Sequence, residues 1–135
     1  MSAARTSRST AQLFVRIKLP GGGVFGPGKA ELLERIDGLG SISAAARQMG
    51  MSYRQAWKLI DTMNAVFKEP VVETSQGGPG GGGATLSGVG REVLRCYSAL
   101  QRKAARNASS DLATISSLLT AKPMSRPSKA PVNRV

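Results

Sequence analysis

Two short amphipathic segments separated by a glycine occupy residues 40–64. The first follows Ser41, a good helix N-cap, and its apolar residues recur at helical spacing: Ile42, Ala45, Ala46 and Met49. The second follows Gly50 and a second candidate cap, Ser52, and its apolar stripe comprises Ala56, Leu59, Ile60, Met63 and Phe67. The pattern predicts a pair of helices joined by a glycine turn.

The second of these helices separates its apolar stripe from a polar and basic face. That face carries Arg54, Gln55, Lys58 and Thr62. Alanines at 45, 46 and 56 allow two helices to cross closely, as they do in the helix-turn-helix unit that places one helix in the major groove of DNA. Periodicity alone fits an ordinary antiparallel helix pair equally well, so both interpretations stand at this point.

Composition narrows the choice of function. The 135 residues include one cysteine, Cys96, and no histidine, which excludes an internal disulfide framework and removes the commonest metal ligand and general base. We therefore expect no enzyme, no metal site and no cofactor. No apolar run approaches the length of a membrane helix, and the first ten residues lack the apolar stretch of a secretory signal, so we expect a cytoplasmic protein without membrane contact.

The net charge of +11 is concentrated at the two ends of the chain. Residues 1–18 and 122–135 together hold eight of the nineteen cations and no acid, whereas the segment between them has eleven cations against all eight acids. We expect a flexible basic arm at residues 1–10, a folded domain at 11–120 and a disordered basic tail at 121–135. Such arms suit a polyanion, although basic ends also act simply as solubilising tails.

The remaining segments predict a compact order of elements. Residues 12–19 alternate as a half-buried strand ended by Pro20 and three glycines, and residues 29–39 have helical spacing. Two β-prone runs at 71–74 and 84–86 flank a glycine-rich stretch and predict a hairpin. Ser87 then opens a trailing helix with a further apolar segment after Ser110. This order is typical of a mainly α fold with a small β-hairpin, the winged helix-turn-helix domain, with residues 71–86 as the wing and a long C-terminal dimerisation helix.

Two stretches, AAARQMGMSYRQAWKLIDTMN and VVETSQGGPGGGGATLSGVGREVL, closely resemble the N-terminal DNA-binding domain of ModE-type molybdenum-dependent transcriptional regulators. The resemblance covers roughly residues 12–119. Its most specific parts are Ser52-Tyr53 with Ala56-Trp57, Met63-Asn64, and the glycine-rich wing from Gly77 to Leu86. LysR-type regulators share the GSISAAARQMGMS portion, and Tyr53, Trp57 and the wing distinguish the ModE type from them. It implies a nucleoid-associated regulator of transcription that binds double-stranded DNA, as a repressor or a dual regulator.

The chain departs from the ModE pattern in two places. Pro79 stands in the glycine run of the wing, where the family usually has a basic residue. Full ModE regulators also continue into paired molybdate-binding domains that open with a threonine-serine-alanine-arginine-asparagine strand, whereas this chain has Met-Ser-Arg-Pro-Ser at residues 124–128. We therefore expect no molybdate-binding residue in it.

The beginning of the second helix would lie against base edges, with the wing close to phosphates. Arg54 can read guanine and Gln55 adenine, whereas Lys58 suits a phosphate or a guanine edge. We expect Trp57 to pack beneath the wing rather than to stack on a base. The residues expected to contact DNA are Ser41, Ser52, Tyr53, Arg54, Gln55, Lys58, Thr62, Gln76, Gly77, Gly78, Gly80 and Gly81.

The trailing helix has an apolar stripe that predicts a homodimer, which would present two reading helices to a palindromic target. The residues expected at this interface are Val93, Leu94, Tyr97, Leu100, Leu112, Ile115 and Leu119. The alternative function is a protein-interaction or non-specific nucleoid-binding module that uses the same fold.

Residues 23–29 match the glycine and lysine spacing of a phosphate-binding P-loop. Ala30 stands where the magnesium-binding Ser or Thr would follow, and Pro27 removes one backbone donor. We therefore do not expect nucleotide hydrolysis.

Overall fold

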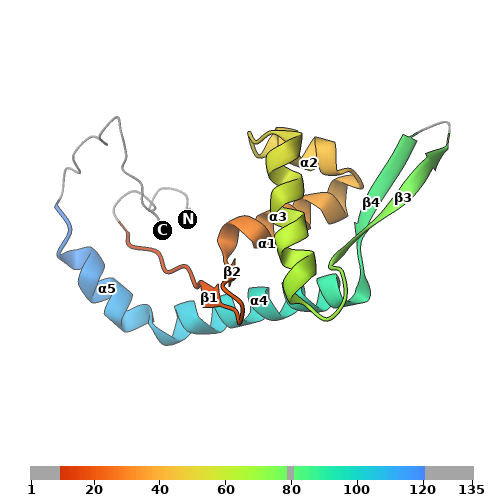
Figure 1. Ribbon diagram of the computed structural model, residues 1–135. Helices are drawn as coiled ribbons and strands as arrows, with labels where there is room; N and C mark the ends of the chain where they lie inside the picture. Colours follow the sequence, from red (N-terminus) through yellow and green to blue (C-terminus); the bar gives the residue numbers. More distant parts are fainter. Residues whose placement is uncertain (1–9, 79–80, 121–135) are drawn as a thin grey trace. The chain divides into compact units, whose positions relative to one another are not determined.

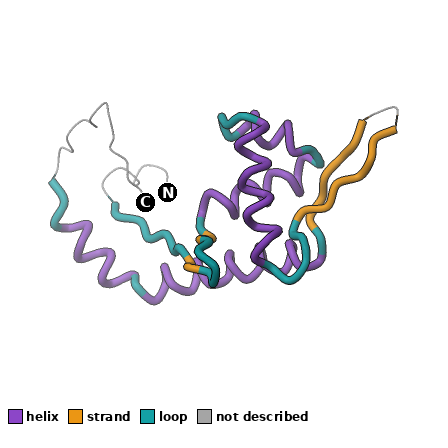
Figure 2. The backbone as a smooth tube through the Cα atoms, viewed as in Figure 1, coloured by secondary structure: helices purple, strands orange, loops and turns teal. Residues whose placement is uncertain are grey.

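The computed structural model describes residues 10–78 and 81–120 and is mainly helical (Figure 1, Figure 2). Its elements are β1 (Ile17–Lys18), β2 (Val24–Phe25), α1 (Pro27–Leu39), α2 (Ile42–Gln48), α3 (Tyr53–Val66), β3 (Val72–Gly78), β4 (Gly81–Leu86), α4 (Gly88–Asn107) and α5 (Ser109–Ser117). Residues 14–104 form one compact unit, and the described residues of a second unit are 10–13 and 105–120. The basic arm and tail that the sequence predicts lie outside the described residues, apart from Thr10.

The first predicted strand is shorter than its alternation suggests. Val15, Ile17 and Leu19 are half-buried and their neighbours exposed, as the period-two pattern predicts, but only Ile17–Lys18 pairs with another strand, β2. The prediction of a strand over residues 12–19 was therefore too long, and β2 was missed. The physical reason is that side chains of α4 satisfy the backbone of Val15: its N–H donates to Gln101 Oε1 at 2.9 Å, and its carbonyl accepts from the Tyr97 hydroxyl at 2.7 Å.

Helix α1 begins two residues before the segment 29–39 that the sequence predicts, whereas α2 and α3 begin at the predicted serine caps. Pro27 begins α1, and Gly40 ends it with φ 70°, a left-handed conformation that favours glycine. Ser41 Oγ accepts from the N–H of Ala44 at 3.0 Å and caps α2. Ser52 Oγ accepts from the N–H of Gln55 at 3.0 Å and caps α3, which confirms both serine caps.

The core lies between α1, α2, α3 and the first part of α4. Alanines 45, 46 and 56 are buried at the α2–α3 crossing, which confirms the close approach that their small size predicts. Burying each large apolar side chain contributes about 1.5 to 3 kcal/mol relative to leaving it exposed. The largest fully buried side chains are Phe25, Leu32, Leu33, Ile36, Ile60, Met63 and Val71.

The wing is the antiparallel hairpin of β3 and β4. Its register pairs Val72 with Leu86 and Gly78 with Gly81, with an irregularity between Ser75 and Gly78. Both strands therefore continue into the glycine-rich stretch, beyond the runs 71–74 and 84–86 that the sequence predicts. Sheet pairing uses backbone groups, which glycine supplies as well as any other residue.

The base of the wing is tied to the helices by hydrogen bonds. The N–H of Ala84 donates to the Gly40 carbonyl at 3.0 Å, and the Ser87 hydroxyl donates to the Pro70 carbonyl at 2.6 Å. The Ser87 oxygen also accepts from the N–H of Gly90 at 3.0 Å, which confirms Ser87 as the cap of α4. These contacts place the wing beside the turn between α1 and α2.

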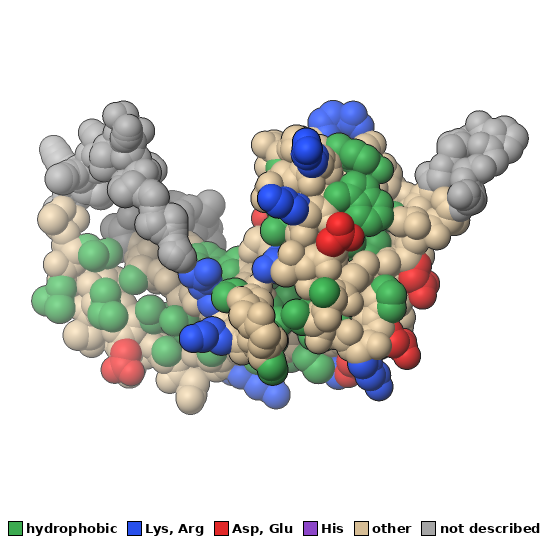
Figure 3. Space-filling view, in the orientation of Figure 1, with side chains coloured by type: hydrophobic (Ala, Val, Ile, Leu, Met, Phe, Trp, Pro, Cys, Tyr) green, Lys and Arg blue, Asp and Glu red, His purple; other side chains and the backbone are tan. Residues whose placement is uncertain are grey.

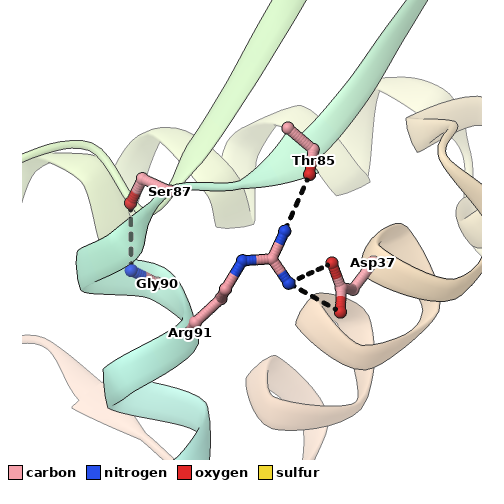
Figure 4. A network of polar contacts seen from close by, with 5 residues as sticks. All are labelled: Asp37, Thr85, Ser87, Gly90 and Arg91. Carbon is pink, nitrogen blue, oxygen red and sulfur yellow. Dashed lines mark hydrogen bonds and ion pairs between the residues drawn. The ribbon is translucent and has the colours of Figure 1, made fainter.

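Arg91 joins three elements at the same place (Figure 4). Its guanidinium contacts both carboxylate oxygens of Asp37 on α1, at 3.0 and 3.2 Å, and donates to Thr85 Oγ1 on β4 at 3.2 Å. The side chain thus links α4, α1 and the wing in one polar network.

The apolar stripe of α4, which the sequence assigns to the dimer interface, contacts the core of its own domain. Tyr97 is only 6% exposed, and its ring meets Phe25 edge-on with centroids 5.3 Å apart. Val93, Leu94 and Leu100 are partly buried against the same core. The stripe therefore packs α4 onto the domain, with Tyr97 as its most buried member.

The second unit contains α5 and the short segment before residue 14. The N–H of Ala11 donates to Ser116 Oγ at 2.8 Å. None of the α5 residues is fully buried, and the exposed fractions are 50% at Ile115, 77% at Leu118 and 48% at Leu119. No helix within residues 10–120 combines the length and hydropathy needed to cross a bilayer.

Candidate nucleic-acid interface

Helix α3 has one buried face and one exposed face. Ala56, Ile60 and Met63 are buried, with exposed fractions of at most 1%. The exposed positions include the residues of α3 that the sequence predicts to contact DNA: Tyr53, Arg54, Gln55, Lys58 and Thr62. All five side chains are therefore accessible to solvent, and Arg54, Gln55 and Lys58 lie opposite the buried face of the helix.

Positive charge accompanies this exposed face. Residues 38–60 contain Arg47, Arg54 and Lys58 and no acid, and the next acid along the chain is Asp61. All three cations are exposed, and Figure 3 shows Lys and Arg side chains over α2 and the beginning of α3. A surface of this sign attracts a polyanion.

The hydroxyl groups near α3 differ in what they can offer. Ser41 and Ser52 accept backbone hydrogen bonds through their oxygens, so each keeps its hydroxyl hydrogen for another acceptor. Thr62 Oγ1 instead donates to the Lys58 carbonyl at 2.9 Å. Its side chain can therefore only accept a further hydrogen bond while that contact holds.

The predicted wing contacts fall on the two strands and their connection. Gln76, Gly77 and Gly78 belong to β3, Gly81 belongs to β4, and Gly80 lies outside the described residues. Glycine strands let another backbone or a phosphate come close, because no side chain intervenes.

A cleft of about 330 Å³ lies between the beginnings of α2 and α3 and the wing. It is lined by Ser41, Ile42, Ser43, Tyr53, Trp57, Thr74, Ser75, Gly83 and Ala84. Trp57 is half-buried against the core, which confirms its predicted packing role, and its ring meets that of Tyr53 edge-on with centroids 6.4 Å apart. Tyr53 itself is 55% exposed.

Sequence reasoning missed Ser43, Thr74 and Ser75 as members of this cleft. Ser43 is an exposed helix residue, and the other two lie on a strand more than thirty positions away along the chain. Contacts between distant segments, such as the one between Gly40 and Ala84 beside α2, bring them together. The sequence carries no signal for that contact.

The P-loop-like lysine has a structural contact. Lys29 Nζ donates to the Val24 carbonyl at 2.6 Å and so joins α1 to β2. Burial lowers the pKa of the Lys29 ammonium, and the nearby Arg16 lowers it further.

Several curated proteins are similar in sequence to this chain. Molybdenum-pterin-binding protein MopB of Rhodobacter capsulatus is 40% identical over 89 residues, which are 66% of this chain and 33% of the relative. The transcriptional regulator ModE of Yersinia pestis is 37% identical over 114 residues, or 82% of this chain and 43% of the relative. The chain is therefore similar in sequence to part of the ModE-type transcriptional regulators.

The ModE resemblance read from the sequence is thereby confirmed. The DNA-binding transcriptional dual regulator ModE of Escherichia coli K12 is 37% identical over 90 residues, which are 67% of this chain and 34% of that protein. The chain spans less than half the length of these ModE and Mop relatives. No family model matches it.

Proposed function

We propose that the chain is a ModE-like transcriptional regulator that binds double-stranded DNA in a sequence-specific manner and reads it with α3. The observation that carries the proposal is the division of α3 into a buried face and an exposed basic face. Arg54, Gln55 and Lys58 lie on the exposed face, and no acid stands in residues 38–60. A helix held in this way can enter the major groove without disturbing the core.

Different residues of α3 would provide sequence specificity and binding affinity. Arg54 can donate two hydrogen bonds to a guanine and Gln55 can pair with an adenine, each pair discriminating against a wrong base by about 1 to 3 kcal/mol. Lys58 on the next turn would bind a phosphate and add affinity that falls with salt. Ser41, Ser52, Thr62 and the wing residues Gln76, Gly77, Gly78, Gly80 and Gly81 are proposed to contact the DNA backbone.

The test compares Arg54→Ala with Lys103→Ala, a control that removes an exposed cation from α4. Duplexes selected from genomic fragments and bulk DNA are titrated at rising salt. Arg54→Ala should weaken binding to the selected duplex by about 5- to 150-fold and bulk binding far less. Lys103→Ala should leave the preference unchanged. A wild-type chain that binds selected and bulk DNA alike would end the proposal.

Regulation of molybdenum-related genes is proposed from the relatives, whose names include a ModE dual regulator and a molybdenum-pterin-binding protein. Genome-wide recovery of bound DNA tests this role. Sites beside molybdate transport genes support it, and reporters fused to those promoters distinguish repression from a dual role. Sites confined to unrelated genes would contradict it.

We further propose that the chain acts as a homodimer joined through α5 rather than α4. Isolated helices of this length are marginal in water, and Ile115 of α5 and the two leucines that follow the helix, Leu118 and Leu119, are about half or more exposed. A second copy would cover these side chains and place two reading helices about 34 Å apart on a palindromic site.

Sedimentation of two matched variants tests the dimer. Ile115→Asp places a charge in the apolar group of α5 and should give a monomer, whereas Thr114→Asp places the same charge on the neighbouring exposed residue and should leave a dimer. A monomeric wild-type chain at micromolar concentration, or equal masses for the two variants, would contradict the proposal.

A further inference from the structure

The cleft between α2, α3 and the wing combines several hydroxyl groups with an absence of charge among its lining residues. None of the nine residues that line it is Lys, Arg, Asp or Glu. We propose that this cleft binds one backbone phosphate of duplex DNA through neutral hydroxyl donors. The inference rests on the proposed function and assigns a ligand to a site that contains Tyr53 but none of the cations of α3.

Three different elements supply the hydroxyl groups. Ser43 comes from α2, Tyr53 from α3, and Thr74 and Ser75 from β3, and all four residues are exposed. The ring of Tyr53 is held edge-on by Trp57, at an interplanar angle of 80°. Because these hydroxyl groups come from separate elements, they line a cleft and do not belong to the terminus of a single helix.

The chemistry of the lining favours an anion that accepts hydrogen bonds. A hydroxyl donates its hydrogen to a phosphate oxygen readily, and phosphate is the commonest acceptor in protein–DNA contacts. A metal ion would need carboxylate ligands, which the lining residues lack. The position of the cleft also favours a phosphate. The cleft lies between α3 and the wing, so a duplex that both elements contact would place its backbone near the cleft.

The walls of the cleft are fixed before any ligand arrives. The N–H of Ala84 donates to the Gly40 carbonyl at 3.0 Å, and the N–H of Gly83 donates to Ser75 Oγ at 3.2 Å. A Cβ on Gly83 would lie 3.3 Å from the Gly40 oxygen, so the wing lies close to the turn before α2. A preformed site loses little conformational freedom on binding.

Neutral donors have a distinctive dependence on salt. A lysine or arginine that neutralises a phosphate releases counterions, so each such contact steepens the fall of log K with log salt concentration. A hydroxyl releases none. The cleft should therefore add affinity that is equal at low and high salt, in contrast to Lys58.

The first experiment measures the dissociation constant for a selected duplex at five salt concentrations. Ser43→Ala, Tyr53→Phe and Thr74→Val should each raise it about two- to tenfold at every concentration and leave the salt slope unchanged. Lys58→Gln should reduce the slope by about one. Ser98→Ala, on α4 outside the cleft, is the matched control and should bind like the wild type. Thermal unfolding of each variant checks that it is folded.

The second experiment replaces single phosphates of the duplex with uncharged methylphosphonates. One position should weaken the wild type yet have little effect on the Ser43→Ala, Thr74→Val double variant, because the contact is already lost there. Folded cleft variants that bind like Ser98→Ala, or that change the salt slope, would overturn the inference while the α3 proposal stands. A wild type without sequence preference would instead overturn the proposed function.

Discussion

The side-chain oxygen of Asn64 accepts a hydrogen bond from the backbone N–H of Val71 at 2.8 Å, which joins the last turn of α3 to the residue that precedes the wing. The same oxygen lies 3.4 Å from the N–H of Val72, the first residue of β3. The Asn64 side chain thus links the last turn of α3 to the start of the hairpin. The wing begins at a place set by α3 itself.

Removal of this acceptor should destabilise the fold. Val71 is fully buried, so Asn64→Ala leaves its N–H without a partner and should cost about 1 to 3 kcal/mol of unfolding free energy. Asn64→Asp retains an acceptor oxygen and should cost less. Urea unfolding measures both, with the exposed Asn107→Ala as control. Equal losses for Asn64→Ala and Asn107→Ala would show that the contact is unimportant.

Two glycines of α4 should respond to alanine in opposite ways. A Cβ on Gly90 would lie 2.2 Å from the Val71 carbonyl oxygen, a backbone atom, so Gly90→Ala must push the helix from the wing base and should cost about 1 to 3 kcal/mol. A Cβ on Gly88 meets nothing within 4 Å, so Gly88→Ala should be neutral or stabilising by up to about 1 kcal/mol. Melting temperatures of the two variants test this prediction. A Gly90→Ala chain as stable as the wild type would contradict the close contact between Gly90 and the Val71 carbonyl.

The ion pair of Arg91 with Asp37 should contribute little to global stability. Its side chains are 55% and 36% exposed, and exposed pairs typically couple by less than about 1 kcal/mol. A double-mutant cycle of Arg91→Gln and Asp37→Asn should therefore give a coupling below about 1 kcal/mol that shrinks as salt is added. Coupling of several kcal/mol, or coupling insensitive to salt, would show that the network of Figure 4 is better shielded than its exposure indicates.

Tyr97 should make stability depend on alkaline pH. Burial raises the pKa of its phenol above the ordinary value of 10.0. The folded chain then keeps the proton where the unfolded chain loses it, so this contribution is complete below pH 10.0 and is lost as pH rises through the raised pKa. Lys29 acts in the opposite sense, because its lowered pKa makes the unfolded chain bind more protons and stability rise with pH.

The difference between wild type and Tyr97→Phe isolates the tyrosine. At pH 7 the variant lacks the hydrogen bond to the Val15 carbonyl and should lose about 0.5 to 1.5 kcal/mol. That difference should shrink above pH 10.0. Denaturant unfolding across the alkaline range measures it, and a constant difference would show that the phenol titrates alike in both states.

Local signals in the sequence were sufficient for the helices and their caps. Ser41, Ser52 and Ser87 cap the helices that they precede, and Gly40 and Gly50 adopt the positive φ expected of stop signals. These features depend on neighbours a few residues away, which periodicity and capping chemistry describe directly.

Contacts between distant segments could not be predicted in the same way. The stripe of Val93, Leu94 and Tyr97 has the same helical spacing whether it covers its own domain or another copy, and only the fold shows that it is covered internally. Strand β2 was missed because two residues give no alternation to detect. The hydroxyl cleft depends on where the wing lies, which no local pattern encodes.

The two faces of α3 have a consequence for how such a protein could change over evolutionary time. Ala56, Ile60 and Met63 anchor the helix from below, whereas Arg54, Gln55 and Lys58 face solvent. Surface substitutions of this kind usually alter stability by no more than about 0.5 kcal/mol. Under the proposed function, the DNA sequence that α3 prefers can therefore change residue by residue while the fold stays intact, and a few point mutations suffice to give a new set of target genes.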